Sequence, residues 1–363
     1  RLSKALFQLM TLEDAAVQVG NVAQQGAASS PSPKSTMPTH HPVPALTRRM
    51  LLALPLVAAA GLRAEESYPS RPITLVIPTV AGGILDTVGR IVGQIVGTLG
   101  QPIVYQNVPG AGSMLGTEVV ARAAPDGYTI AVVATSHAIN PSVYARMPYD
   151  TGRDLAPICH TVNLTNLLVV NPSVPAASIQ ELIALAKRKP GTLTFGSAGI
   201  GQSNHLSGEM LRSMAGIDIV HVPYKGSAAA MNDVLAGHLT MMFVDVLSAL
   251  PHVKAGKLRA LATAGPKRSE AAPDYPTVSE SGVPGFNGNS WLGLVGRAGT
   301  PKPVLDKLAH TVTQGLLDSA TKQRLLAQGV EPVGGTPEEF AAFIESETKR
   351  YAAAVAAAGI KRE

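Results

Sequence analysis

Two glycine-rich turns are the places where this chain could bind an anion through its backbone. The first, residues 81–83, follows an apolar run at residues 73–77 and precedes a helical pattern that begins near Asp86. The second is the segment GSAGIGQSNH, residues 196–205, which leads into a helix from about Ser203. Each turn places backbone N–H groups at a helix N-terminus, where the helix dipole favours a negative charge. If the two turns face each other across a cleft, they could bind a carboxylate between them. Either turn alone is equally well explained as an ordinary strand-to-helix turn.

A third glycine cluster, PGAGSMLG at residues 109–116, has a spacing close to that of a dinucleotide-binding loop. However, Pro109 follows the preceding strand directly, and no acidic residue ends a strand about twenty residues later, where a ribose partner is expected. We therefore predict a tight turn that packs a helix on a sheet, and no cofactor.

The residues needed for catalysis are scattered along the chain. It contains neither a G-x-S-x-G elbow nor an H-E-x-x-H helix, and its histidines show no metal-ligand spacing. His205 and Glu209 form an i, i+4 pair, but a zinc site needs a third donor, so a structural role is favoured. Cys159, the only cysteine, lies in an apolar stretch and is expected to be a buried thiol. The sequence thus predicts binding rather than turnover, with no catalytic residue and no metal.

The net charge of +5 belongs mostly to the first part of the chain. After Ala64 the numbers of basic and acidic residues are almost equal, so we expect no basic surface that binds nucleic acid. Residues 37–64 contain paired arginines, a short apolar run and a small residue at Ala64, the pattern of a secretory signal peptide. Export to the periplasm follows, by the general secretory or the twin-arginine route. Residues 1–36 are expected to be a gene-model extension or a disordered segment.

From residue 68 onward, short apolar runs alternate with helical patterns, which predicts an α/β fold. Ser178 with Glu181, and Thr336 with Glu339, fit the capping box, and Thr300 precedes a proline expected at the first helical position. The predicted strands are residues 73–77, 103–106, 129–134, 193–195, 219–222, 239–244, 259–264 and 291–295.

Two segments rich in proline, glycine and serine, residues 170–178 and 272–290, indicate where a second domain is entered and left. We expect the chain to cross near residue 165 and to return near residue 288. Lobe 1 would then consist of residues 65–165 and 289–363, and lobe 2 of residues 166–288. Two crossings make a hinge with a cleft, and such clefts are preferred ligand sites.

Several motifs in one order resemble the Bug family, the periplasmic substrate-binding receptors of tripartite tricarboxylate transporters. The resemblance covers residues 68–363. It is carried by YPSRPITLVIP, AGGILDTVGR, NVPGAGSMLG, APDGYT, HAINPSVY, GSAGIGQSNHLSGE, VHVPYKG, SALPHVKAGKLRALA, PTVSESGVPGF, WLGL and GTPEEFAAFI.

The resemblance implies a bilobed periplasmic binding protein of type II, two α/β lobes joined by two crossing segments, with a small carboxylate between the lobes. It implies large and small membrane permease subunits as partners, and we expect a monomer. A ligand sensor with a signalling partner has the same fold and site, and a small-acid enzyme is a weaker alternative. The ligand-binding residues carried over by motif are Ala81, Gly82, Gly83, Ile84, Leu85, Asp86, Thr135, Ser136, His137, Ser197, Ala198, Gly199, Gly201, Gln202, Ser203 and Asp245.

The chain departs from similar proteins at three places. Ile84 and Leu85 replace a common Ser-Thr pair, Gln202 replaces a threonine, and the aspartate usual after the strand phenylalanine stands one place later, at Asp245. Fewer hydroxyl donors and more aliphatic surface would shift preference from a small hydroxylated acid toward one with an apolar portion.

Overall fold

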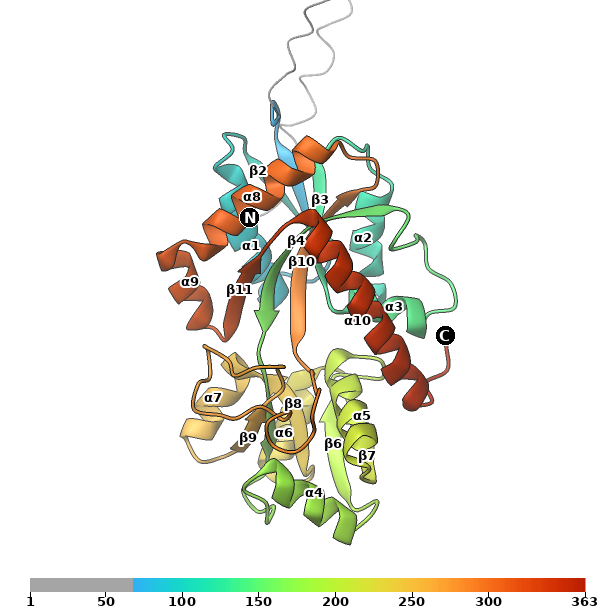
Figure 1. Cartoon of the computed structure of the whole chain (residues 1–363), viewed down its shortest axis with the longest axis vertical. Coiled ribbons are helices and arrows are strands. Elements are labelled where there is room, and N and C mark those ends of the chain that lie inside the picture. The colour runs from blue at the N-terminus through green and yellow to red at the C-terminus, as the bar shows by residue number, and fades with distance from the viewer. Residues whose placement is uncertain (1–67, 363) are drawn as a thin grey trace, which may run out of the picture. The chain divides into compact units, whose positions relative to one another are not determined.

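The computed structural model describes residues 68–362, which belong to one compact unit. The predicted signal peptide and the segment before it lie outside the described residues. Two β-sheets, each covered by helices on both faces, follow one another along the long axis of this unit (Figure 1).

Sheet A has six strands in the order β11-β4-β10-β3-β1-β2. The first three strands of the chain are parallel, whereas β10 is antiparallel to both β3 and β4, and β11 is antiparallel to β4. The strands are β1 (Ile73–Ile77), β2 (Ile103–Asn107), β3 (Thr129–Ala134), β4 (Leu155–Leu164), β10 (Ser290–Arg297) and β11 (Val330–Gly334).

Helices cover both faces of sheet A because strand side chains alternate between the faces. Ile73, Leu75 and Ile77 pack on one face with α1, α8 and α9, whereas Val76 packs on the other with α2, α3 and α10. The helical segments are α1 (Ile84–Gly97), η1 (Ala111–Ser113), α2 (Met114–Ala121), α3 (Ser136–Val143), α8 (Lys302–Leu317), α9 (Ser319–Leu326) and α10 (Pro337–Ala357).

Sheet B has five strands in the order β7-β6-β8-β5-β9, with α4 and α5 on one face and α6 and α7 on the other. Its elements are β5 (Asn166–Val170), α4 (Ile179–Arg188), β6 (Leu193–Ser197), α5 (Ser203–Ala215), β7 (Ile219–Pro223), α6 (Ser227–Ala236), β8 (Met241–Asp245), α7 (Val246–Lys254) and β9 (Arg259–Thr263). No helix within residues 68–362 is both long and apolar enough to cross a bilayer.

The chain passes between the sheets twice. On the way out, Thr165 alone separates β4 from β5, and on the way back residues 264–289 connect β9 to β10. The two passages are tied together, since the Asn166 side-chain amide donates to the Gly288 carbonyl at 3.0 Å. The predicted lobe boundaries, which would give each lobe one sheet, stay a prediction.

All eight predicted strands are present, with ends that differ by up to two residues, but β4, β5 and β11 were not predicted. β4 contains Pro157 and several polar residues, and its pairing with β10 is interrupted by register shifts. β11 contains Pro332, which is tolerated because this strand lies at the sheet edge. β5 is a short apolar run immediately after β4, so the chain offers no turn signal between the two strands.

Helix starts were predicted less accurately. The Ser178 hydroxyl accepts the Glu181 amide, and the complete capping box at Thr336 is present. Two other predicted starts were wrong. α1 begins at Ile84 rather than near Asp86, and α8 begins at Lys302, which makes Pro301 the N-cap rather than the first helical residue.

Two buried histidines should make the fold sensitive to mild acid. Burial lowers the pKa of His137 and of His160 to about 4, from an ordinary value of 6.5. Their neutral forms thus stabilise the fold fully above pH 6.5, and this contribution is lost as pH falls toward 4. We expect these two histidines to lower the free energy of unfolding by up to about 3 kcal/mol per pH unit in that window, and the half-buried His221, whose pKa is also lowered to about 4, to add a smaller amount.

Urea unfolding at several pH values measures this slope. The buried carboxylate Asp86 contributes little to it, because both its ordinary pKa of 3.8 and its lowered pKa of about 2 lie below this window. A His160→Phe variant should show a shallower slope, since phenylalanine suits a position stacked on Phe343. Replacing the exposed His310 with asparagine serves as the control. If the free energy of unfolding falls equally steeply with pH in the parent and in both variants, the buried histidines do not cause the acid sensitivity.

Candidate functional site

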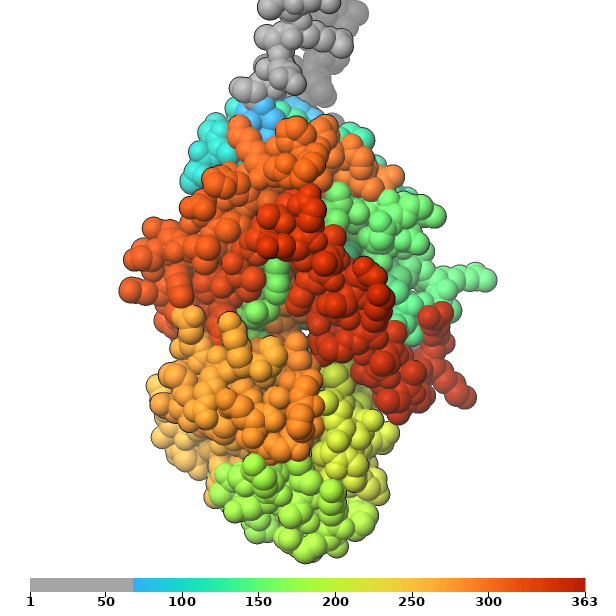
Figure 2. Space-filling view, viewed as in Figure 1, coloured from blue at the N-terminus to red at the C-terminus, as the bar shows by residue number. Residues whose placement is uncertain are grey.

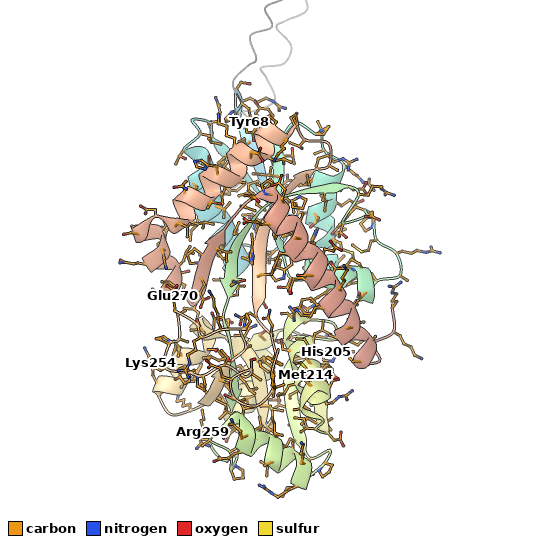
Figure 3. The ribbon with its side chains drawn as sticks, in the orientation of Figure 1. Tyr68, His205, Met214, Lys254, Arg259 and Glu270 are labelled. Carbon is orange, nitrogen blue, oxygen red and sulfur yellow. The ribbon has the colours of Figure 1, made fainter. Side chains whose placement is uncertain are left out.

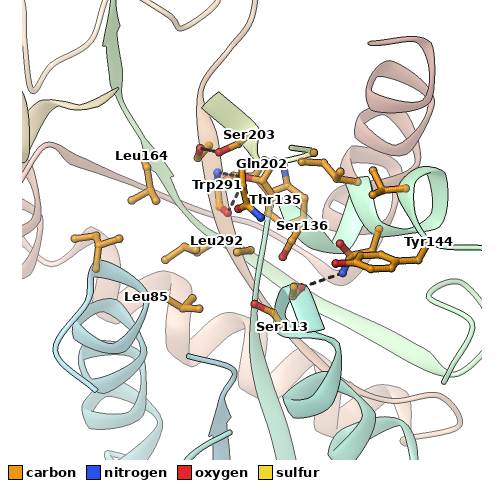
Figure 4. Close-up of a pocket in the computed structure, with 18 of the residues that line it drawn as sticks. Leu85, Ser113, Thr135, Ser136, Tyr144, Leu164, Gln202, Ser203, Trp291 and Leu292 are labelled. Carbon is orange, nitrogen blue, oxygen red and sulfur yellow. Dashed lines mark hydrogen bonds between the residues drawn. The ribbon is translucent and has the colours of Figure 1, made fainter. Parts of the chain in front are cut away.

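A cavity of about 250 Å³ lies where elements of both sheets meet. Most of its wall belongs to elements of sheet A, and the loop between β6 and α5 contributes the part from sheet B (Figure 4). The lining residues are Ile84, Leu85, Gly112, Ser113, Ala134, Thr135, Ser136, Ile139, Asn140, Val143, Tyr144, Leu164, Ile200, Gly201, Gln202, Ser203, Ser290, Trp291 and Leu292.

Four helices begin at this cavity. Its wall includes Ile84 at the start of α1, Ser113 before α2, Ser136 at the start of α3 and Ser203 at the start of α5. Within the described chain, none of these four N-termini has a side-chain cap, and α6 and α8 also lack one, whereas α4, α7, α9 and α10 are capped by side chains. Helix N-termini carry N–H groups without intrahelical partners and a partial positive charge, so the cavity favours an anion.

The cavity wall contains no Asp, Glu, Lys, Arg or His among the described residues. Leu85 and Leu164 lie on one side of the close-up, and Ser113, Ser136 and Tyr144 lie nearer the other (Figure 4). The wall also includes the aliphatic residues Ile139, Val143 and Ile200. A ligand with a charged end and an apolar portion matches this mixture of polar and aliphatic surface. Within residues 68–362, no cluster of side chains could hold a metal ion.

The turn before α1 is fixed by Asp86. One oxygen of its carboxylate accepts the Gly82 amide and the Arg90 Nε, both at 3.0 Å, and the other accepts the Asn107 side-chain amide at 2.9 Å. The hydrogen bond from Arg90 is the main cause of the lowered pKa of this carboxyl. Asp86 is 4% exposed and does not line the cavity, so it supports the turn from behind.

The two glycines of this turn differ in what they require. Only Gly82 has a positive φ, of +95°, whereas an added Cβ at Gly83 meets no atom within 4 Å. Gly82→Ala should therefore lower the free energy of unfolding by about 1–2 kcal/mol, the cost of a left-handed backbone for an L-residue. Gly83→Ala should stay within about 0.5 kcal/mol of the parent protein. Urea unfolding of the matched pair tests this, and equal losses would contradict it.

The turn before α5 uses most of its backbone amides internally. The amide of Ala198 donates to Asn204, Gly199 to Ser197, Gly201 to His205 and Gln202 to the Gly199 carbonyl. In this conformation these four amides are therefore already paired, and the prediction that this turn binds the ligand stays a prediction. Three of the amides are paired with side chains two to six residues away, which spacing alone does not reveal.

The structure brings together only some of the predicted site residues. Those that line the cavity are Ile84, Leu85, Thr135, Ser136, Gly201, Gln202 and Ser203. Those that do not are Ala81, Gly82, Gly83, Asp86, His137, Ser197, Ala198, Gly199 and Asp245. His137 is buried behind the wall, and Asp245 is the N-cap of α7, where its carboxylate accepts the Ser248 amide at 2.8 Å.

Several residues that line the cavity were not predicted. For two of them, Gly112 and Ser113, the glycine cluster at residues 109–116 was a visible sequence signal. Four successive residues, 110–113, have positive φ, including the non-glycine residues Ala111 and Ser113. Strained backbone of this kind concentrates at functional sites. Here it is held by Asn140, whose side-chain amide donates to the Gly112 carbonyl at 3.0 Å, and it places Ser113 in the cavity wall.

Trp291 is the other important addition. It is the only tryptophan of the chain, is 1% exposed, and lies at the cavity where β10 begins. Its backbone N–H donates to the Thr135 hydroxyl at 2.9 Å, and its indole N–H donates to a Glu347 carboxylate oxygen at 2.9 Å. The fluorescence of one residue therefore reports on the cavity.

Comparison with known proteins agrees with this architecture. Residues 89–360 match the model of the tripartite tricarboxylate transporter family receptor. Protein BugT of Bordetella pertussis is 33% identical over 322 residues, which span 87% of this chain and 99% of BugT. An R. palustris protein whose structure was solved with adipate is 32% identical, with a TM-score of 0.71 over 82% of this chain and 100% of that one.

MatC from Rhodopseudomonas palustris, solved with bound malate, is 30% identical, with a TM-score of 0.66 over 79% of this chain and 100% of MatC. The family match covers well over half of the chain, and the relatives align over nearly their full lengths. The chain therefore belongs to the Bug family, the receptors of tripartite tricarboxylate transporters, which are periplasmic solute-binding proteins with a bilobed α/β fold of type II.

Proposed function

We propose that this receptor binds a small carboxylate in the cavity between its two lobes and delivers it to a tripartite membrane permease. The observation that carries the proposal is the convergence of four helix N-termini without side-chain caps on a wall without charged side chains. A carboxylate there is stabilised by helix N–H groups and by hydroxyls such as Ser113 and Ser136, with no ion pair.

The ligand class follows from the rest of the wall. Ile84, Leu85, Leu164 and Leu292 offer aliphatic surface, which rewards an apolar portion and leaves extra ligand hydroxyls unpaired. We therefore propose a carboxylate with a branched or aromatic portion rather than a small hydroxylated acid. Two relatives were solved with carboxylates of different character, adipate and malate, which fits a family that varies its pocket chemistry.

A carboxylate panel tests both parts of the proposal. Benzoate, 3-methylbutanoate, adipate, malate and citrate are titrated against the full chain, with Trp291 fluorescence and the melting temperature as readouts. A ligand that binds only the folded state at 100 times its Kd adds about 2.7 kcal/mol of stability, which raises the melting temperature. Tighter binding of malate or citrate than of benzoate and 3-methylbutanoate would contradict the ligand class. No response to any carboxylate would contradict the proposed site.

Delivery to a permease rests on the family alone. In cells that express this receptor with both permease subunits, uptake of the ligand found in the panel should require all three proteins. Chemical turnover of the ligand by the purified receptor would instead favour an enzyme.

A further inference from the structure

Two histidine rings lie behind the loop that contributes residues 200–203 to the cavity. His205 is in the first turns of α5 (Figure 3), and His221 is in β7. Their ring centroids are 3.7 Å apart and the planes are nearly parallel, at 22°. The side chain of His205 is 5% exposed, so this ring is part of the interior, whereas His221 is half-buried; neither lines the cavity.

His205 holds one end of the loop. Its Nδ1 accepts the Gly201 amide at 3.0 Å, in a buried hydrogen bond. Only a nitrogen without a proton can accept, so the ring proton must be on Nε2. That nitrogen faces a Glu209 carboxylate oxygen at 3.7 Å, and the other oxygen of Glu209 lies 3.0 Å from the Arg212 Nε. The bond to Gly201 fixes a residue whose φ is +74°.

His221 holds the other end through Ser197. The Ser197 Oγ accepts the Gly199 amide and donates to the Gly199 carbonyl, both at 3.1 Å, and lies 2.6 Å from the His221 Nε2. Because the hydroxyl has a single proton, the imidazole nitrogen is the donor to Ser197 when the hydroxyl donates to the Gly199 carbonyl. Burial lowers the pKa of His221 to about 4, so this ring is neutral at neutral pH.

We propose that His205 is a positioning residue for ligand binding. Its unprotonated Nδ1 holds Gly201 in the conformation that turns Gln202 and Ser203 toward the cavity, and the stacked ring of His221 keeps it in place. The inference rests on the proposed function of the cavity. No contact between His205 and the ligand is needed, because the effect passes through the Gly201 amide.

Two variants separate this role from simple packing. His205→Phe keeps an aromatic ring for the stack with His221 but removes the acceptor. His205→Asn loses the stack but retains a side-chain oxygen near the position of Nδ1. His238→Asn is the control, because that side chain is 74% exposed and lies at the far end of α6.

The first readout needs no ligand. Amide hydrogen exchange at Gly201, followed by NMR in the full chain, should be at least about tenfold faster in His205→Phe than in the parent protein, and close to the parent rate in His205→Asn. The second readout is benzoate affinity from Trp291 fluorescence. It should weaken about tenfold in His205→Phe, equivalent to about 1.4 kcal/mol, and recover in His205→Asn.

Unchanged Gly201 exchange in His205→Phe would overturn the inference, and so would equal loss of affinity in both His205 variants. If the parent protein fails to bind benzoate, the proposed ligand class is contradicted, whereas the exchange measurement still decides the role of His205. Far-UV circular dichroism checks that each variant is folded.

Discussion

Replacing Arg350 with methionine should lower the free energy of unfolding by about 3–5 kcal/mol, the cost of removing one partner from a buried ion pair. Glu347 is 4% exposed, and Arg350 binds it through two hydrogen bonds, from Nε to one oxygen at 2.8 Å and from Nη2 to the other at 2.6 Å. The second oxygen also accepts the Trp291 indole N–H. Without Arg350, the carboxylate would be left charged in the interior.

The same arginine joins α10 to elements of sheet B. Its Nη1 donates to the Asn287 carbonyl at 2.5 Å and lies 3.5 Å from the Met210 sulfur on α5. Figure 2 shows the surface of α10, in red, meeting the yellow-green surface that belongs to α5. Loss of Arg350 should therefore weaken contacts between the two sheets as well as the ion pair itself.

Urea unfolding followed by circular dichroism and Trp291 fluorescence measures the loss. The matched control is the double variant Glu347→Gln/Arg350→Met, in which no buried charge remains and the glutamine oxygen can still accept the indole N–H. It should recover most of the stability, since neutral replacement of a buried pair costs little. If Arg350→Met unfolds at the parent urea concentration, the pair is not stabilising and this account is wrong.

Replacing Ile84 with serine and Leu85 with threonine together should reverse the ligand preference. Both aliphatic side chains line the cavity at the first turn of α1. One methylene in an apolar pocket is worth roughly 10- to 200-fold in discrimination, so we expect benzoate affinity to fall at least about tenfold. The new hydroxyls should strengthen malate binding, because they provide partners for its hydroxyl and carboxylates.

Fluorescence titration of the double variant with benzoate and malate measures the ratio of the two affinities. The control replaces two exposed leucines outside the cavity wall, Leu247 on α7 and Leu317 on α8, with serine. That variant should keep the parent ratio. An unchanged ratio in the Ile84/Leu85 variant would mean that the first turn of α1 does not select the ligand.

The sequence predicted much of the fold because its signals are local. β1 and β3 have the predicted bounds, and the capping box at Thr336 is formed as expected. The three missed strands are those for which local signals mislead, since β4 and β11 contain prolines that only the sheet context accommodates. Two segments rich in proline, glycine and serine indicated a second lobe, and the family motifs implied the same arrangement.

The candidate site was predicted only in part, and the reasons are physical. Glycine-rich turns at helix starts are visible in a sequence, so Ile84, Leu85 and the loop at residues 201–203 were among the predicted residues. The partners of individual amides are not visible, because Asn204 and His205 reach back onto the loop only in the folded chain. Trp291 is 156 residues from Thr135, and only the pairing of β10 with β3 brings them together.

The two passages between the sheets also set how far each part of the cavity can travel. Leu164 and Trp291 belong to β4 and β10, the strands that carry the chain out of sheet A and back into it. In a hinge motion, residues close to the hinge move less than residues far from it. If the proposed ligand binding closes one lobe on the other about these strands, the part of the cavity wall formed by Leu164 and Trp291 should keep its shape, while Leu85 and Gln202 move farther. A ligand would then contact Leu164 and Trp291 first, and the fluorescence emission of Trp291 should change before Leu85 and Gln202 reach the ligand.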